Sequence, residues 1–206
     1  MTSLPHRFTL LQRLLHWLMA VCIIAMFFIG VGMVSTVTPK YLPLISIHKT
    51  LGVTLLVLVL IRLALRLYYG APPLPVDLPA TIKLGAYLSH VALYGLMIVM
   101  PLLGVSMLWA AAYPVVLAGG IQIPPLLPQS DGVHTLLWNA HFYLAFAFFA
   151  LVLLHVAAAL FHALIRRDGV FETISPVSLA ARATPAERDT HARPAVNVQT
   201  EKYSRG

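Results

Sequence analysis

The 206-residue chain has few charged side chains: Asp, Glu, Lys and Arg make up 10% of it, while 59% of its residues are hydrophobic. Soluble domains usually carry about 25% charged residues. No charged residue lies between Lys83 and Asp131, or between Asp131 and Arg166, and the mean hydropathy is +0.84. This scarcity argues against a water-soluble domain and predicts segments that lie in a lipid bilayer.

Cysteine is almost absent as well. Cys22 is the single cysteine, so the chain cannot form an internal disulfide, and a four-cysteine iron–sulfur cluster is excluded. The sequence has no C-x-x-C-H motif, which excludes covalent attachment of a c-type haem. It also has no H-E-x-x-H motif and no acidic residue within its apolar segments, which makes an intramembrane zinc enzyme a weak hypothesis.

Four long apolar segments remain. A helix needs about 20 mostly apolar residues to cross a bilayer, and only helices and closed barrels satisfy the hydrogen bonds of the backbone there. We therefore predict an all-α fold, an integral membrane four-helix bundle. No A-x-A-like cleavage site follows the first segment, so we interpret it as a retained helix rather than a signal peptide. The predicted spans are residues 13–35, 46–68, 84–112 and 137–165.

The net charge of +7 is distributed unevenly. Four spans place most basic side chains on one side of the membrane and only Lys40 and Lys49 on the other. The positive-inside rule then predicts that both termini and the 69–83 loop are cytoplasmic. Because topology accounts for the positive charge, we expect lipid and no nucleic acid as a partner. The basic residues on the predicted inner side are Arg7, Arg13, Arg62, Arg66, Lys83, Arg166 and Arg167.

The connections and the tail complete the predicted organisation. The connection over residues 113–135 contains Pro114, Gly119, Gly120, Pro124, Pro125 and Pro128. It is long enough to lie across the outer mouth of the bundle. After about residue 173 the chain turns to Pro, Ala, Thr and mixed charge, a composition that cannot build a core. We therefore assign residues 1–172 to the membrane domain and residues 173–206 to a polar, disordered cytoplasmic tail.

Histidine within a bilayer is costly and usually functional, and here four histidines lie at complementary depths. His141 and His155 are fourteen residues apart in one span, which is about 21 Å along a helix and about 40° short of four full turns. They therefore face nearly the same way at two depths. No single metal ion can bind both, because metal–nitrogen bonds are only about 2 Å long. Each needs a partner from another span.

Depth suggests those partners. His48 stands at the outer end of the second span and matches His141. At the inner end, His16 can pair with His155 or with His162. His162 is 21 residues from His141, about 31 Å and thus the whole hydrocarbon thickness, so we favour His155. Imidazole is an axial ligand of haem iron, and this pattern predicts two stacked bis-histidine haems between the helices.

Neighbouring side chains are candidates for supporting roles. Arg62 lies fourteen residues beyond His48, on the same helical face, where a guanidinium can pair with a haem propionate or extend to the lipid headgroups. Lys49 can hold an outer propionate or attract an anion. His162 is a candidate for a hydrogen bond to a quinone carbonyl. His90 fits a helix-packing hydrogen bond as well as a site role.

Four stretches of the sequence resemble the bacterial cytochrome b561 family. The resemblance implies four transmembrane helices with two haems b, ligated by His16 with His155 and by His48 with His141, in a bacterial inner membrane. Within the family the chain is most similar to the superoxide oxidase branch, which implies that superoxide gives electrons at the outer face and ubiquinone accepts them nearer the cytoplasm. The resemblance covers about residues 8–172. The stretches that carry it are LLQRLLHWLMA around His16, ISIHKTLG around His48, VLIRLALRL with Arg62 and Arg66, and LLHVAAALFHALIRRDG around His155 and His162.

A second function is compatible with the same features. The chain can be an electron-carrier subunit that anchors a hydrogenase or dehydrogenase and passes its electrons to quinone. A redox donor protein then takes the place of superoxide as the partner. The haem ligands and the bundle are the same in both hypotheses, so the residues alone do not choose between the two electron donors.

Overall fold

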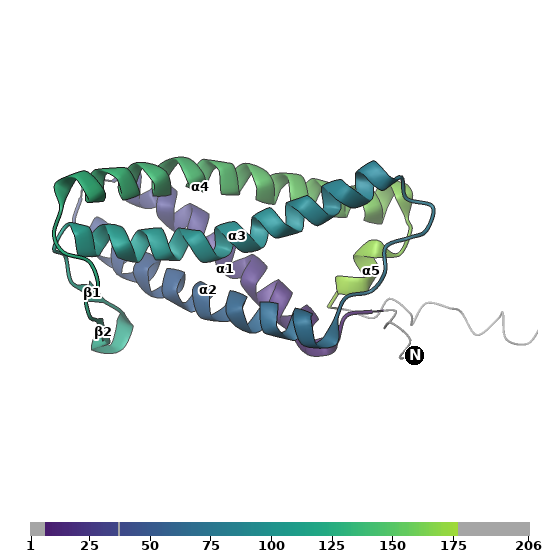
Figure 1. The fold of residues 1–206 in the computed structure, drawn as a ribbon, viewed down its shortest axis with the longest axis horizontal. Coiled ribbons are helices and arrows are strands. Elements are labelled where there is room, and N and C mark those ends of the chain that lie inside the picture. Colours follow the sequence, from purple (N-terminus) through teal and green to yellow (C-terminus); the bar gives the residue numbers. More distant parts are fainter. Residues whose placement is uncertain (1–6, 37, 177–206) are drawn as a thin grey trace, which may run out of the picture. The chain divides into compact units, whose positions relative to one another are not determined.

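The computed structural model describes residues 7–36 and 38–176, which belong to one compact unit. Four of its helices are long and apolar enough to cross a membrane, so the predicted all-α membrane bundle is confirmed. The predicted tail over residues 177–206 lies outside the described residues. The helices in Figure 1 are α1 (Leu10–Val34), α2 (Tyr41–Tyr69), α3 (Ala80–Ala110), α4 (Asp131–Leu160), which continues as a π-helical turn (Phe161–Arg166), and α5 (Val170–Ile174).

All four long helices begin before the predicted spans, and polar residues cap two of them. At the start of α1, Thr9 Oγ1 accepts a hydrogen bond from the N–H of Gln12 at 3.3 Å. Gln12 Oε1 accepts one from the N–H of Thr9 at 3.0 Å, which completes a capping box. At the start of α4, Ser130 Oγ accepts from the N–H of Val133. Hydropathy misses these first turns, since capping residues are polar.

The connection between α3 and α4 forms a small antiparallel hairpin. Strand β1 (Val115–Val116) pairs with β2 (Gln122–Ile123) through a short turn, and Val115 faces Ile123 across the ladder. The N–H of Ala118 in the turn donates to Thr50 Oγ1 of α2 at 2.9 Å. This bond holds the hairpin against the start of α2. In Figure 1 the hairpin and α5 lie at opposite ends of the bundle, here named the hairpin end and the α5 end.

The helices pack unevenly against one another. α3 lies along α4, α1 along α2, and α2 along α3, whereas the backbone of α4 makes few close approaches to α1 or α2. Axes of closely packed helices are about 8–10 Å apart. α4 therefore stands away from α1 and α2, and side chains from these three helices line the space between them.

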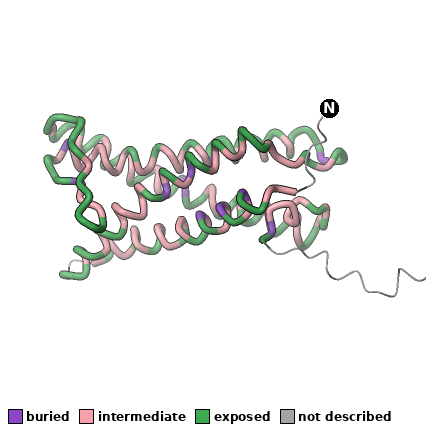
Figure 2. The backbone as a smooth tube through the Cα atoms, turned by 90° about the horizontal axis from the view of Figure 1, so that it is seen from below, coloured by how far each residue is buried: buried purple, intermediate pink, exposed green. Residues whose placement is uncertain are grey.

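The buried core is small. Leu15 and Met19 of α1 pack against Val59 of α2, which is fully buried. Most other helical positions are half-buried or exposed, as Figure 2 shows along the length of the bundle. Many exposed side chains are large and apolar, such as Phe28, which is 75% exposed. Helices that are apolar on all sides are buried in lipid or in a large core, so these surfaces are suited to contact lipid.

An aromatic cluster crosses the space between α1 and α4 at mid-depth. The ring of Phe27 meets the rings of Phe148 and Phe149 edge-on, with centroids 5.5 and 5.2 Å apart. Phe148 is 8% exposed. It lies seven residues from His141 and seven from His155, so it occupies the same face of α4 about halfway between the two imidazoles.

The compact unit ends at α5, which returns to the start of α1. The N–H of Phe8 donates to the carbonyl of Thr173 at 3.2 Å. Trp17 Nε1 donates to the carbonyl of Ile174 at 3.0 Å. The unit therefore reaches Pro176, four residues beyond the boundary expected at 172. Composition does not reveal this extension, because long-range hydrogen bonds to α1 hold it.

We expect the substitution Phe148→Ala to lower the free energy of unfolding by about 3 kcal/mol, because it leaves a cavity between α1 and α4. Thermal unfolding in one detergent, followed by circular dichroism, measures the change. Phe28→Ala removes the same ring from an exposed position and is the matched control, with an expected effect within about 0.5 kcal/mol. Equal losses for both variants would contradict a special packing role for Phe148.

Candidate functional site

At the hairpin end, His48 of α2 faces His141 of α4. Their ring centroids are 6.2 Å apart and their planes are inclined by 66°. Nδ1 of each ring is buried without a hydrogen-bond partner among the described residues. The carbonyl of Met100 lies near the His141 ring but outside normal hydrogen-bond geometry. A buried polar atom without a partner is costly, so the surroundings of this pair are unusual for a site of simple helix packing.

At the α5 end, His16 of α1 faces His155 of α4. These ring centroids are 6.3 Å apart with an interplanar angle of 70°. A third imidazole, His90 of α3, lies with its centroid 5.5 Å from that of His155. Its Nδ1 is 2.6 Å from the carbonyl of Ala86, one helical turn earlier, so His90 makes the hydrogen bond within its own helix. Three helices thus bring imidazoles together at this end.

The separation within each facing pair fits two imidazoles on opposite sides of one metal ion. Two metal–nitrogen bonds of about 2 Å and a ring half-width of about 1.2 Å on each side place the centroids about 6.4 Å apart. The observed values are 6.2 and 6.3 Å. Both pairs join α4 to helices that it does not pack against closely, which leaves room for a flat macrocycle. The residues present therefore fit bis-histidine haem at both positions.

Glycines widen the hairpin-end position. A Cβ atom on Gly104 of α3 would lie 3.5 Å from Cε1 of His141, and one on Gly30 of α1 would lie 3.9 Å from Cε1 of His48. These are ordinary contact distances for one carbon, so a Cβ atom at either position would already touch an imidazole. Glycine at these two positions therefore keeps the surroundings of both imidazoles open.

Arg62 lies near the pair at the α5 end. Its Nη1 donates to the carbonyl of Gln12 at 3.1 Å, one turn before His16. Gln12 is itself 4% exposed and donates from Nε2 to the carbonyl of Gly70 at 3.2 Å. The guanidinium is thus held at the depth expected from the sequence. At the hairpin end, Lys49 is half-buried and directly follows His48.

His162 takes no part in either facing pair. It lies in the π-helical turn after α4, and its Nδ1 is 2.8 Å from Oδ2 of Asp168. The same oxygen accepts a hydrogen bond from Nε of Arg166 at 2.7 Å. Arg166 also pairs with Asp77 in the connection between α2 and α3. The sequence analysis missed these acids, although Asp168 and Asp77 stand out among the basic residues at this end.

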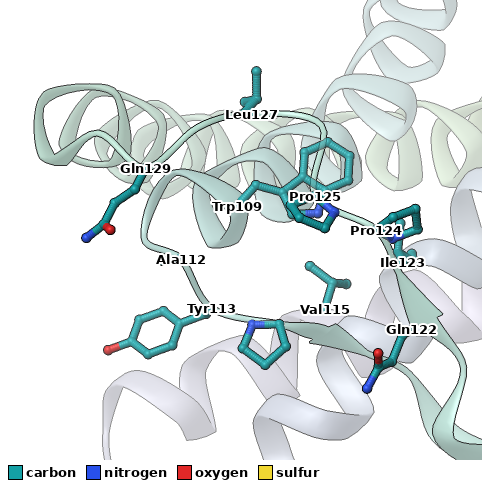
Figure 3. A pocket seen from close by; sticks show the side chains of 11 residues that line it. Trp109, Ala112, Tyr113, Val115, Gln122, Ile123, Pro124, Pro125, Leu127 and Gln129 are labelled. Atoms are coloured by element: carbon teal, nitrogen blue, oxygen red, sulfur yellow. The ribbon is translucent and has the colours of Figure 1, made fainter.

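The chemistry of the hairpin end differs from that of the α5 end. The α3–α4 connection lines an open pocket of about 650 Å³ with an uncharged lining (Figure 3). Trp109 contributes an indole whose Nε1 is buried without a hydrogen-bond partner in the described part of the chain. The pocket therefore offers no carboxylate or imidazole for acid–base chemistry. The lining residues are Trp109, Ala112, Tyr113, Pro114, Val115, Gln122, Ile123, Pro124, Pro125, Leu127 and Gln129.

Within residues 7–36 and 38–176, no three side chains of His, Cys, Asp or Glu are placed to hold one metal ion. Catalytic zinc generally needs three protein ligands. The imidazoles instead face each other in twos, as bis-histidine ligation requires.

A model of the family described as prokaryotic cytochrome b561 matches residues 7–176. The chain belongs to this family. It is 30% identical over 170 residues to cytochrome b561 homolog 2 of Escherichia coli K12, covering 81% of this chain and 90% of that protein. It is 26% identical over 172 residues to the probable superoxide oxidase CybB of Yersinia pestis, covering 82% and 96%.

A further relative, cytochrome b561 homolog 1 of Escherichia coli K12, is 26% identical over 180 residues and covers 83% of this chain and 98% of that protein. The resemblance drawn from the histidine and arginine motifs is thus confirmed. As a prokaryotic cytochrome b561 with four membrane-length helices, the protein is a membrane cytochrome of electron transfer. The family implies haem b, which the two imidazole pairs fit.

We expect Gly104→Leu to lower the haem bound per polypeptide, because the added side chain fills the space beside His141. Gly95→Leu is the matched control. It lies nine residues earlier in the same helix, two and a half turns away and so on the opposite face, and a Cβ there meets nothing within 4 Å. Haem is measured as the pyridine haemochrome of purified protein. Full haem content in Gly104→Leu would contradict the assignment of a haem position beside His141.

Proposed function

We propose that this cytochrome b561 oxidises superoxide at the hairpin end and reduces ubiquinone at the α5 end, with two haems b held by His48 with His141 and by His16 with His155. The observation that carries the proposal is the pair of facing imidazoles near each end of one helix. His141 and His155 are fourteen residues apart in α4, about 21 Å along the axis. Two cofactors at that spacing connect opposite sides of a bilayer core about 30 Å thick.

Haem iron in such a site supplies reversible one-electron exchange. The protein supplies the ligands, the spacing and the dry surroundings. Phe27, Phe148 and Phe149 close the mid-depth of the bundle between the two positions. An apolar barrier there keeps water and protons from following the electrons.

The hairpin end suits an anionic electron donor. Its basic side chains among the described residues include Lys49, directly after His48, and the exposed Lys40. Positive charge near an entry point raises the encounter rate with a negative substrate. One relative, the probable superoxide oxidase CybB of Yersinia pestis, matches this chain over 172 residues, which are 96% of its own length. These observations support superoxide as the donor.

The α5 end suits ubiquinone. Reducing one ubiquinone consumes two electrons, released by the oxidation of two superoxide anions to dioxygen, and two protons from the adjacent water. His162 supplies an imidazole for a quinone carbonyl, and Arg62 is placed for a propionate of the haem at this end. The positive-inside rule assigns this end, which holds Arg166, Arg167 and Lys83, to the cytoplasmic side of a bacterial inner membrane.

We expect each of His16→Ala, His48→Ala, His141→Ala and His155→Ala to lose one of two haems, because a six-coordinate bis-histidine haem is held from both sides. The pyridine haemochrome count should fall from about two to about one per polypeptide, the stoichiometry expected of two separate sites. His90→Ala and His134→Ala are controls that should keep both. Loss of haem in His90→Ala with retention in His16→Ala would exchange their roles and contradict the ligand assignment.

In stopped-flow experiments, superoxide should reduce the haems of the purified protein, and ubiquinone should oxidise them again. Lys49→Glu should slow reduction by superoxide about tenfold at low salt, because it reverses charge beside the entry point. Lys83→Glu makes the same change at the α5 end and should leave this rate unaltered. If superoxide leaves the haems oxidised while an iron–sulfur partner co-purifies and reduces them, the protein is an electron-carrier subunit.

A further inference from the structure

The end of α4 places an acid beside His162. In a continuous α-helix, residues six positions apart point about 120° away from each other, so His162 and Asp168 would not meet. Here the N–H of Arg167 bonds to the carbonyl of His162 at 2.7 Å, a π-type bond over five residues. Arg167 then adopts the left-handed conformation with φ of +52°. Both features are uncommon and recur at functional sites.

The resulting contacts fix the roles of the two ring nitrogens of His162. An ionised carboxylate can only accept hydrogen bonds, so Nδ1 of His162 carries the hydrogen in the 2.8 Å contact with Asp168. The side chains of His162 and Asp168 are only 15% and 10% exposed. Nδ1 is thereby occupied, and Nε2 is the nitrogen that remains for a ligand.

Asp168 is kept ionised by its surroundings. Burial raises the pKa of its carboxyl, but the hydrogen bonds from His162 and from the N–H of Val170, the charge of His162 and the hydrogen bond from Arg166 together outweigh burial, and the net shift of the pKa is downward. Arg166 in turn reaches Asp77, whose side chain is 70% exposed. A chain of polar contacts thus runs from His162 to water.

We propose that Asp168 is a positioning residue for quinone reduction: it holds Nδ1–H of His162 so that Nε2 faces the quinone, and its charge stabilises the ring when both nitrogens carry hydrogen. This inference rests on the proposed function. A doubly protonated ring donates its Nε2–H to a quinone carbonyl oxygen. A neutral ring held by Asp168 accepts from the hydroxyl of the product through the same atom.

The proton and electron balance is complete. Ubiquinone takes two electrons from the oxidation of two superoxide anions, and both carbonyl oxygens become hydroxyls. One proton comes from Nε2–H of His162, where the N–H bond breaks as the O–H bond forms. The second proton, and the one that restores His162, come from water at the α5 end. Asp168 stays ionised throughout, as a carboxylate that orients an imidazole does.

The main variants for the test are His162→Ala, Asp168→Asn and Asp168→Glu in the haem-loaded, full-length protein. Asn preserves the size of Asp168 but removes its charge, whereas Glu restores a carboxylate on a longer arm. Asp131→Asn makes the isosteric change in the first turn of α4, at the hairpin end, where Asp131 is exposed. Haem content and the rate of haem reduction by superoxide should be unchanged in Asp168→Asn and in Asp131→Asn.

Two measurements address the α5 end. The first is the rate at which saturating ubiquinone oxidises pre-reduced haem, which should fall about tenfold to a hundredfold in Asp168→Asn, the size of effect seen when the partner of a functional histidine is removed. Asp168→Glu should recover part of this oxidation rate. The second is the infrared band of ¹³C-labelled ubiquinone carbonyl bound to the oxidised protein. It should move toward the position of free quinone in Asp168→Asn, because the hydrogen bond from Nε2 weakens.

The outcomes distinguish a failure of the positioning role of Asp168 from a failure of the proposed quinone site. If His162→Ala leaves both measurements unchanged, quinone does not use His162, and the proposed quinone site fails together with the inference. If His162→Ala slows oxidation and shifts the band while Asp168→Asn does neither, only the inference is overturned. A loss of haem or of superoxide-driven reduction in Asp168→Asn would show a structural role and would also overturn it.

Discussion

The arrangement of this protein depends on imidazoles that an apolar bundle cannot satisfy by itself. A histidine in a bilayer is tolerated only with a partner, and the bundle supplies few polar side chains for that purpose. Nδ1 of His48 and Nδ1 of His141 are buried with no hydrogen-bond partner in the described residues. The rings face each other at a distance that one metal ion spans. An iron porphyrin bound between these rings would supply coordination that the helices lack, and would couple haem binding to the stability of the bundle.

This constraint also explains the uneven packing. A bundle whose helices all met closely would have no space between facing histidines. Here α4 packs along α3 but stays apart from α1 and α2, so both imidazole pairs lie across interfaces where the helices are separated. Leu15, Met19 and Val59 close the α1–α2 interface, and Phe27 with Phe148 bridges the wider one at mid-depth. Direct packing is thus concentrated where no cofactor is expected.

Much of this arrangement follows from the sequence. Four apolar stretches fix the helices, and the fourteen-residue spacing of His141 and His155 fixes two positions on one face, since both depend only on helical periodicity. Whether His155 or His162 faces His16 needed the structure, because depth in the membrane depends on helix tilt. His155 faces His16, whereas His162 bonds to Asp168. The pairing of ligands to haem remains a prediction that the geometry supports.

The features that the sequence did not predict share a physical cause. The contact between His162 and Asp168 requires a π-type turn and a left-handed arginine, and periodicity assumes that neither occurs. The docking of residues 173 and 174 beside the start of α1 depends on hydrogen bonds to their backbone carbonyls, which a residue of any type at these two positions could accept. Local pattern predicts elements that continue, but it does not predict how an element ends.

The two ends of the bundle differ in a way that fits the proposed direction of electron transfer. The pocket at the hairpin end has an uncharged lining, and dioxygen, the product proposed for this end, carries no proton. The α5 end holds His162, Asp168, Arg166 and Asp77 in one connected set, and ubiquinone needs two protons for each two electrons. Proton-carrying groups are useful only where protons are consumed. Their concentration at the α5 end therefore favours quinone reduction there over a site at the hairpin end, whichever donor supplies the electrons.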